Sequence, residues 1–287
     1  MPILDLLTPR AHDLGGGMVV KRVLPSAKKQ AVGPFIFFDH FGPVQVTPQS
    51  QHDVRPHPHI GLATVTYLFD GAMMHRDSMG VTQRIEPGAL NWMTAGRGVV
   101  HSERRPEDLR ETSYINHGLQ LWVALPTADE EIEPSFQHIP AADIPQWQGD
   151  GITARILVGT AFGLQSPVQT LQEMLYLDVQ AEANSSFTLP ASDLELALYS
   201  PEQIIIVDGV ALEPGVMALL QPQVATTISI VQSARFVVLG GSKLDGHRHI
   251  WWNFVSSRKE RIEQAKLAWA AQEMGTVPGE QEWIPLP

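Results

Sequence analysis

The chain has 287 residues, of which 44% are hydrophobic and 18% charged, a composition typical of a globular protein with a substantial core. Its 20 Lys and Arg residues against 31 Asp and Glu residues give a formal net charge of -11, which repels phosphate backbones and argues against direct nucleic-acid binding. The sequence contains no cysteine, so disulfides, thiolate metal sites and cysteine nucleophiles are excluded, and histidines and carboxylates remain as metal ligands.

The sequence gives no sign of a membrane or export segment. Its first residues lack the basic and apolar regions of a signal peptide, and no apolar run approaches the roughly 18 residues needed to cross a bilayer. We therefore expect a soluble, cytoplasmic protein with no membrane partner.

Short strands are expected throughout the first half. A run of aromatic residues, Phe35-Ile36-Phe37-Phe38, ends in a turn at Gly42-Pro43. Between Thr64 and Val100, strand candidates are separated by turn signals at Asp70-Gly71, Met79-Gly80 and Pro87-Gly88. Residues 118–125 alternate well enough to form a further strand. Regular short strands of this kind predict an all-β sandwich or barrel.

Two pairs of ligand-type residues flank these strands. One pair is His57 and His59, and the other is His101 and Glu103. Because residues i and i+2 of a strand lie on the same side, each pair aims two ligand groups at one face. The intervening strands can return the pairs to one barrel wall. Three imidazoles and one carboxylate suit a divalent first-row metal and leave positions open for water, oxygen or substrate.

The character of the sequence changes in the acidic, proline-punctuated connection at residues 126–151. We interpret it as a domain boundary near residue 136, which divides residues 1–135 from residues 136–287. The second half repeats the strand pattern at 154–158, 174–179, 186–189, 194–199, 204–207, 216–220, 227–231 and 236–239. Asp208-Gly209 predicts a hairpin turn. Residues 140–240 contain no histidine, so a second barrel would lack a metal site of the first kind.

One helix is expected near the end of the chain. Ser257-Arg258-Lys259-Glu260 matches a capping box. Ile262, Ala265 and Trp269 follow at the spacing of one helical face and predict an amphipathic helix that ends near Gly275.

The pattern from residue 57 to residue 103 resembles the pirin family, a branch of the cupin superfamily. The matching segments are His57-Pro58-His59-Ile60-Gly61, Thr64-Val65-Thr66-Tyr67-Leu68, His75-Arg76-Asp77-Ser78-Met79-Gly80, the run from Trp92 to Glu103, and, earlier, Phe38-Asp39-His40-Phe41-Gly42-Pro43. The resemblance implies an all-β bicupin, that is, two tandem cupin barrels, with the late helix after them. The N-terminal barrel, residues 1–135, would hold one metal, and the C-terminal barrel, residues 136–287, would have lost its own.

The resemblance also implies the ligands: His57, His59, His101 and Glu103. Iron is the expected metal, and manganese, nickel, cobalt, copper and zinc are alternatives that such ligands also accept. One position departs from the family, since Ala63 stands where many pirins have Glu. This change removes a nearby charge and leaves the ligand set intact.

Members of the family show two kinds of activity. Some open the flavonol quercetin with molecular oxygen and release carbon monoxide, which here predicts a mononuclear metal-dependent dioxygenase of the quercetin 2,3-dioxygenase type. Glu103 would then also be catalytic, as the base that takes the flavonol hydroxyl proton. Others act through protein partners as transcriptional cofactors or modulators of metabolic enzymes. The alternative is therefore a non-catalytic, metal-binding regulatory protein with a protein partner in place of the small aromatic substrate.

Several other residues admit two interpretations each. His40 either faces the site or is a buried histidine bonded to a backbone carbonyl, and Asp77, beside His75, either orients a ligand imidazole or caps a turn. Arg97 either steers an anionic substrate or is solvated. The pair in His247-Arg248-His249 has no third ligand nearby and is interpreted as structural. The remaining candidates, interpreted as core, are Phe38, Trp92 and Met93.

Overall fold

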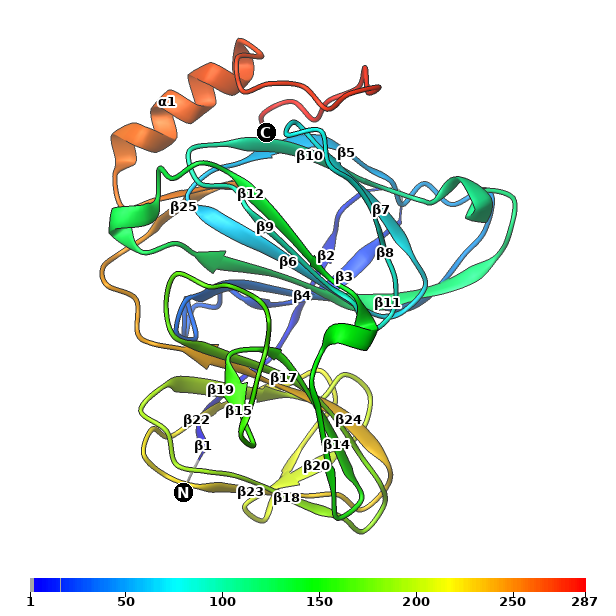
Figure 1. Cartoon of the computed structure of the whole chain (residues 1–287), viewed down its shortest axis with the longest axis vertical. Coiled ribbons are helices and arrows are strands. Elements are labelled where there is room, and N and C mark those ends of the chain that lie inside the picture. The colour runs from blue at the N-terminus through cyan, green and yellow to red at the C-terminus, as the bar shows by residue number, and fades with distance from the viewer. Residues whose placement is uncertain (1–2, 16) are drawn as a thin grey trace. The chain divides into compact units, whose positions relative to one another are not determined.

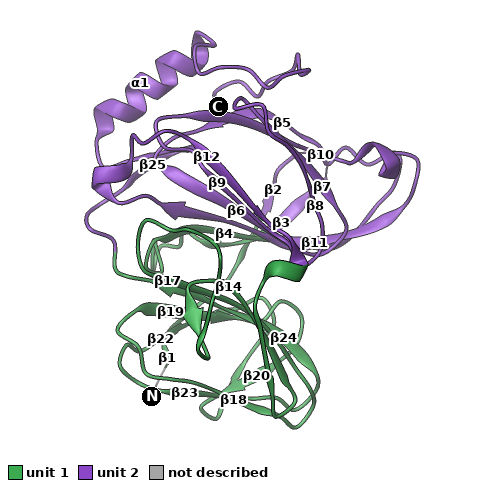
Figure 2. Cartoon of the chain, viewed as in Figure 1, with its two compact units in different colours: residues 1–11, 21–40, 142–243 green, residues 12–20, 41–141, 244–287 purple. Residues whose placement is uncertain are grey.

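The computed structural model describes residues 3–15 and 17–287, and β-strands dominate it (Figure 1). The chain forms two compact units that are interleaved in sequence (Figure 2). Unit 1 comprises residues 1–11, 21–40 and 142–243, and unit 2 comprises residues 12–20, 41–141 and 244–287. The sequence analysis placed a single boundary near residue 136. The chain does change unit nearby, after residue 141. It also changes unit at four other places, after residues 11, 20, 40 and 243.

Unit 2 contains the strands predicted in the first half of the chain. A seven-stranded sheet has the order β12-β9-β6-β11-β4-β3-β2, and a four-stranded sheet has the order β5-β10-β7-β8. Three of these strands, β2, β3 and β4, continue from one unit into the other. The bounds are β2 (Arg10–Asp13), β3 (Val19–Leu24), β4 (Phe35–Val46), β5 (Val54–His59), β6 (Leu62–Asp70), β7 (Met73–Asp77), β8 (Thr82–Ile85), β9 (Leu90–Thr94), β10 (Val99–Arg104), β11 (Tyr114–Ala124) and β12 (Ser135–Ile139). Short 3-10 helices lie at η1 (Glu107–Leu109), η2 (Thr127–Asp129) and η3 (Ala141–Asp143).

Unit 1 holds the strands of the second half together with the first strand of the chain. Its main sheet has the order β1-β22-β19-β24-β17-β14-β13, and the second has the order β18-β23-β20-β21. The bounds are β1 (Ile3–Leu7), β13 (Gln146–Gly149), β14 (Ile152–Val158), β15 (Thr160–Ala161), β16 (Leu164–Gln165), β17 (Met174–Ala181), β18 (Ser186–Leu189), β19 (Glu195–Tyr199), β20 (Ile205–Val207), β21 (Val210–Leu212), β22 (Met217–Leu220), β23 (Thr226–Ser229) and β24 (Ala234–Gly241). The predicted hairpin is confirmed, since Val207 pairs with Val210 across Asp208 and Gly209, both at positive φ.

The core of unit 1 is apolar. Its buried cluster is formed by aliphatic and aromatic side chains from both sheets, among them Leu177, Leu198, Phe187, Phe236 and Val238. The facing side chains fill the space between the sheets with hydrocarbon, which is how a small β-barrel is usually stabilised.

The C-terminal segment of unit 2 forms a two-stranded ribbon, β25 (His249–Trp251) with β26 (Phe254–Ser256), followed by α1 (Lys259–Ala270). The predicted helix face is confirmed, because Ile262, Ala265 and Trp269 are all buried. The predicted capping box is wrong, and so is the predicted end near Gly275. The residue before the helix is Arg258, without a side-chain cap, and the Ser257 hydroxyl instead donates to Glu130 Oε2 at 3.0 Å.

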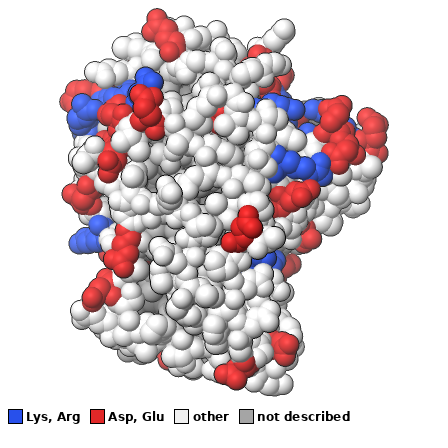
Figure 3. Space-filling model, viewed as in Figure 1, with Lys and Arg blue, Asp and Glu red and all other residues white. Residues whose placement is uncertain are grey.

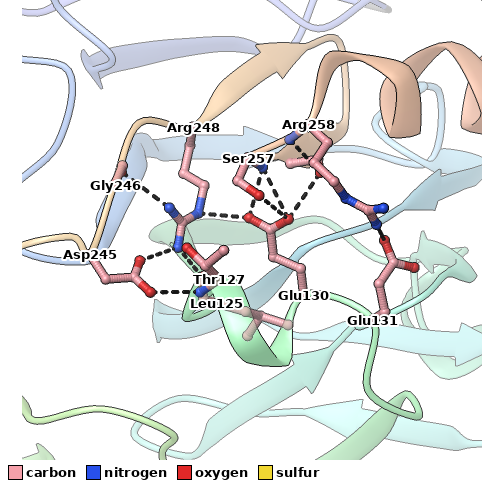
Figure 4. Close-up of polar contacts among 10 residues, drawn as sticks. Leu125, Thr127, Glu130, Glu131, Asp245, Gly246, Arg248, Ser257 and Arg258 are labelled. Atoms are coloured by element: carbon pink, nitrogen blue, oxygen red, sulfur yellow. Dashed lines mark hydrogen bonds and ion pairs between the residues drawn. The ribbon is translucent and has the colours of Figure 1, made fainter.

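A buried ion pair attaches this segment to the rest of unit 2 (Figure 4). Arg248 Nε lies 2.9 Å from Glu130 Oε1, and the two residues are only 4% and 3% exposed. Glu130 also accepts hydrogen bonds from the backbone N–H of Ser257 and the hydroxyl of Ser256. On the other side, Arg248 donates to the Leu125 carbonyl at 2.7 Å. Arg248 therefore has a structural role, and the structural interpretation of the histidines on either side of it stays a prediction.

The surface carries both signs of charge. On the face drawn in Figure 3, Lys and Arg side chains lie among Asp and Glu side chains and form no continuous basic area. None of the helices in residues 3–15 and 17–287 has the length and apolar character needed to cross a membrane.

Candidate metal centre

The two predicted ligand pairs lie on adjacent strands of unit 2. Strands β5 and β10 are antiparallel neighbours, and His101 is directly opposite His57. The ring centroids of these two imidazoles are 4.3 Å apart, and each lies 5.0 Å from the ring of His59. Each of the three residues offers one nitrogen within 4.8 Å of the others. Within residues 3–15 and 17–287, this is the one group of three or more ligand-type residues so arranged.

The three imidazoles are buried in the form that binds a metal. Burial lowers the pKa of His57 to about 4 and holds the pKa values of His59 and His101 well below the usual range for histidine. A neutral imidazole has a free lone pair, which a metal ligand needs.

The lone pairs are also available. His57 Nδ1 donates to the Arg55 carbonyl at 2.9 Å, which leaves its Nε2 free. Nδ1 of His59 and Nε2 of His101 are buried without a hydrogen-bond partner among the described residues. Buried polar atoms without a protein partner are rare in folded proteins, and a cation bound by all three rings would account for them. The residues therefore fit a divalent transition metal.

Glu103 lies on the same strand but outside this group of three. The register of β10 against β5 shifts between His101 and Glu103, so that Glu103 is opposite Val54. The side chain is buried, and burial raises the pKa of its carboxyl group to about 7. A nearby divalent cation would favour the ionised form of such a group. Its role as fourth ligand and as base stays a prediction.

A second pair of polar residues adjoins the imidazoles. His75 and Asp77 lie on β7, which pairs with β10 on the side away from β5. His75 Nε2 is 2.9 Å from Asp77 Oδ2, and His75 Nδ1 is 3.4 Å from Nδ1 of His101. The other Asp77 oxygen accepts hydrogen bonds from the backbone of Met79 and Val81. Asp77 thus caps the turn, as one interpretation of the sequence held, and it also contacts His75, the neighbour of the predicted ligand His101.

Aromatic rings also contact this group. Trp122, on β11, meets His59 edge to face at 5.2 Å, and Phe136, on β12, stacks on His75 at 4.6 Å. The sequence analysis had singled out Trp92 and Met93 instead, and both are buried in the core as it expected. Trp122 and Phe136 were missed because their strands reach the site only through sheet pairing, which leaves no local signal.

The outer side of the ligand strands is covered by the C-terminal tail. Ser102 and Arg104 alternate with the ligand residues along β10 and point to the opposite side. The Ser102 hydroxyl donates to Glu280 at 2.8 Å, and Arg104 donates to the same carboxylate at 2.5 Å. The backbone N–H of Ile284 donates to the Pro56 carbonyl on β5 at 2.9 Å. Both ligand strands are therefore fixed from outside.

Three other candidates lie outside this group. His40, in unit 1, is buried, and its Nδ1 is 2.7 Å from the Tyr199 hydroxyl. Arg97 is exposed and pairs with Glu133. The rings of His247 and His249 lie 4.6 Å apart, and neither belongs to a group of three ligand-type residues.

Comparison with known proteins identifies relatives of the whole chain. The family described as Pirin matches residues 17–123, and the Pirin C-terminal cupin domain matches residues 176–275. A pirin-like protein from Caulobacter vibrioides is 44% identical over 290 aligned positions, which cover 99% of this chain and 100% of that protein. These matches confirm the prediction of two cupin domains.

Two solved structures extend the comparison. A quercetin 2,3-dioxygenase from Acinetobacter baumannii is 32% identical, with a TM-score of 0.93 over 99% of this chain and 95% of that one. The bacterial pirin YhhW from Escherichia coli, solved in complex with nickel(II), has the same fold with a TM-score of 0.65 at 14% identity, over 84% of this chain and 99% of that one.

Proposed function

Because this chain belongs to the pirin family, we propose that it is a mononuclear metal-dependent dioxygenase that opens the ring of a flavonol, or of a similar enolisable aromatic, with molecular oxygen. The observation that carries the proposal is the buried group of His57, His59 and His101, whose free nitrogens converge. The similarity to the Acinetobacter baumannii dioxygenase over nearly the whole chain supports this choice of reaction.

We assign four metal ligands, His57, His59, His101 and Glu103, within the predicted N-terminal domain of residues 1–135. Iron is the first expectation, and manganese, nickel, cobalt, copper and zinc also accept imidazole and carboxylate ligands. When bound, a divalent ion held by three neutral imidazoles and one carboxylate supplies a net positive centre that favours an anionic enolate and activates it toward oxygen.

We assign the proton transfer to Glu103. A flavonol hydroxyl group that loses its proton to a carboxylate oxygen of Glu103 becomes the enolate, and the proton stays on the buried carboxyl group.

Metal content is the first test. Elemental mass spectrometry of the purified protein should find about one transition-metal ion per chain, and a His101→Ala/Glu103→Ala variant should hold none. A histidine outside the site, His249→Gln, is the matched control and should keep the metal. If neither the purified protein nor the protein reconstituted with each candidate ion holds metal, the oxygenase proposal is wrong.

Oxygen uptake with quercetin is the second test. Uptake that requires the metal and disappears in His57→Ala, but persists in His249→Gln, supports the enzyme. A metal-loaded protein that consumes no oxygen with any flavonol, but binds a defined protein partner, would establish the regulatory alternative.

We further propose that the protein acts in the cytoplasm and binds neither nucleic acid nor membranes directly. The net charge of -11 supports the first of these exclusions, since it opposes approach to phosphate backbones. Cell fractionation and an electrophoretic mobility assay at low salt would test these assignments.

A further inference from the structure

A line of buried polar side chains leads from the metal centre into the neighbouring strand. It runs from His101 on β10 to His75 and then to Asp77, both on β7, and these residues are 1%, 2% and 0% exposed. We propose that Asp77 and His75 are positioning residues that fix the proton of His101 on Nδ1, so that its Nε2 presents a lone pair to the metal. This inference rests only on the metal-binding half of the proposed function, and not on the oxygenase reaction.

The position of each proton follows from the contacts. The Asp77 carboxylate can only accept, so His75 Nε2 donates to its Oδ2 across 2.9 Å. A neutral His75 then carries a lone pair on Nδ1, which faces Nδ1 of His101 at 3.4 Å. With one proton on each ring, the only hydrogen bond that can join these two nitrogens has His101 Nδ1 as its donor. Nε2 of His101, which has no partner among the described residues, is thereby left unprotonated.

The ring of His75 is held in place for this role. Phe136 stacks on it at 4.6 Å with an angle of 28° between the ring planes, and the contact with Asp77 fixes its far end. Residues beyond the metal ligands that orient a ligand imidazole typically change metal affinity by about 10- to 100-fold when mutated. The line through His75 differs from the usual direct carboxylate contact, because a second imidazole transmits the effect.

Asp77 also caps a turn, and one substitution separates its two roles. Its Oδ1 accepts from the backbone N–H groups of Met79 and Val81, whereas Oδ2 faces His75. In Asp77→Asn the two backbone donors retain the amide oxygen, so the amide NH2 must face His75 Nε2. The proton of His75 is then displaced to Nδ1, and the proton of His101 is displaced to Nε2, on the metal side.

The experiment measures zinc affinity by competition with a chromogenic chelator, together with the imidazole nitrogen shifts of histidine-labelled, metal-free protein. We expect Asp77→Asn to weaken zinc binding at least about tenfold and to move the His101 proton from Nδ1 to Nε2. The His101 signals would be assigned with His101→Gln. If Asp77→Asn stays folded, binds zinc within about twofold of the unmodified protein and keeps the proton on Nδ1, Asp77 only caps the turn and the proposal is overturned.

A matched pair at His75 decides the question if Asp77→Asn does not fold. Asn and Leu have similar shape, but Asn places a carbonyl oxygen near the position of His75 Nδ1 and Leu places a methyl group there. We expect His75→Asn to retain most of the zinc affinity and His75→Leu to lose it about tenfold or more. Equal affinities in the two variants would overturn the proposal. Should the unmodified protein bind neither zinc nor any other candidate ion, the proposed metal function fails, and the His101 proton position alone still tests the line.

Discussion

The buried pair of Glu130 and Arg248 offers the sharpest test of how the C-terminal segment is attached. In Glu130→Gln the shape of the side chain is kept, but the charge that Arg248 faces at 2.9 Å is removed. Removing one partner of a buried ion pair commonly destabilises a protein by about 3–5 kcal/mol, because the other charge stays buried and unpaired. Arg248 retains Asp245, a half-exposed carboxylate. We therefore expect the lower end, about 3 kcal/mol.

The neighbouring residue provides the control. Glu131 pairs with Arg258 and Arg261, but its side chain is 41% exposed, so Glu131→Gln should cost at most about 1 kcal/mol. Six of the seven tryptophans lie in unit 2, and their fluorescence during urea denaturation therefore reports on this unit. A double variant, Glu130→Gln/Arg248→Met, should lose less stability than the two single effects added together, because no buried charge is then left without a partner.

If Glu130→Gln and Glu131→Gln unfold within about 0.5 kcal/mol of each other, the range expected of ordinary surface substitutions, the buried pair does not attach the segment. If the double variant is additive, the loss of stability comes from lost packing and not from an unpaired charge.

Three further outcomes are expected. The unmodified protein should melt at a higher temperature as zinc is added. The variant His101→Ala/Glu103→Ala, which lacks both predicted ligands of β10, should lose this stabilisation. Glu280→Gln should speed zinc release measured by stopped-flow chelation, because the carboxylate that holds the outer side of β10 is lost; an unchanged rate would show that the tail does not support the ligands. Gly61→Ala should prevent folding or lower the free energy of unfolding by more than about 3 kcal/mol, because an added Cβ would meet the Val255 carbonyl oxygen at a backbone φ of 67°. Gly80→Ala, at a φ of 88° with no atom near the added Cβ, should cost only about 1 kcal/mol. Urea denaturation measures both.

The sequence predicted those features that depend on local spacing. The side-chain alternation of a strand placed His57 and His59 together. The helix face and the hairpin at residues 208–209 were predicted for the same reason. In each of these cases the signal and the structure involve the same few residues.

Features set by distant partners were not predicted. Ser257 fits the start of a capping box, but Glu130, far away in the sequence, takes its hydroxyl group. His75 is adjacent to His101 only because β7 pairs with β10. The first strand of the chain pairs with β22 near residue 219, and this pairing interleaves the units. No local pattern encodes such pairings, because they are decided by which sheet edge is free when the barrels close.

The structure also explains why the C-terminal segment belongs to the unit that holds the ligands. The ligand strands carry histidines on one face, so Ile60 and Val100, next to the ligands in sequence, must find apolar partners elsewhere. They find them in one cluster with Phe254, Trp269 and other residues of the C-terminal segment. In unit 1, by contrast, the side chains between the two sheets form an apolar cluster of their own. A barrel that gives part of its interior to imidazoles thus obtains apolar packing from outside, and disruption of the cluster around Trp269 should weaken metal binding.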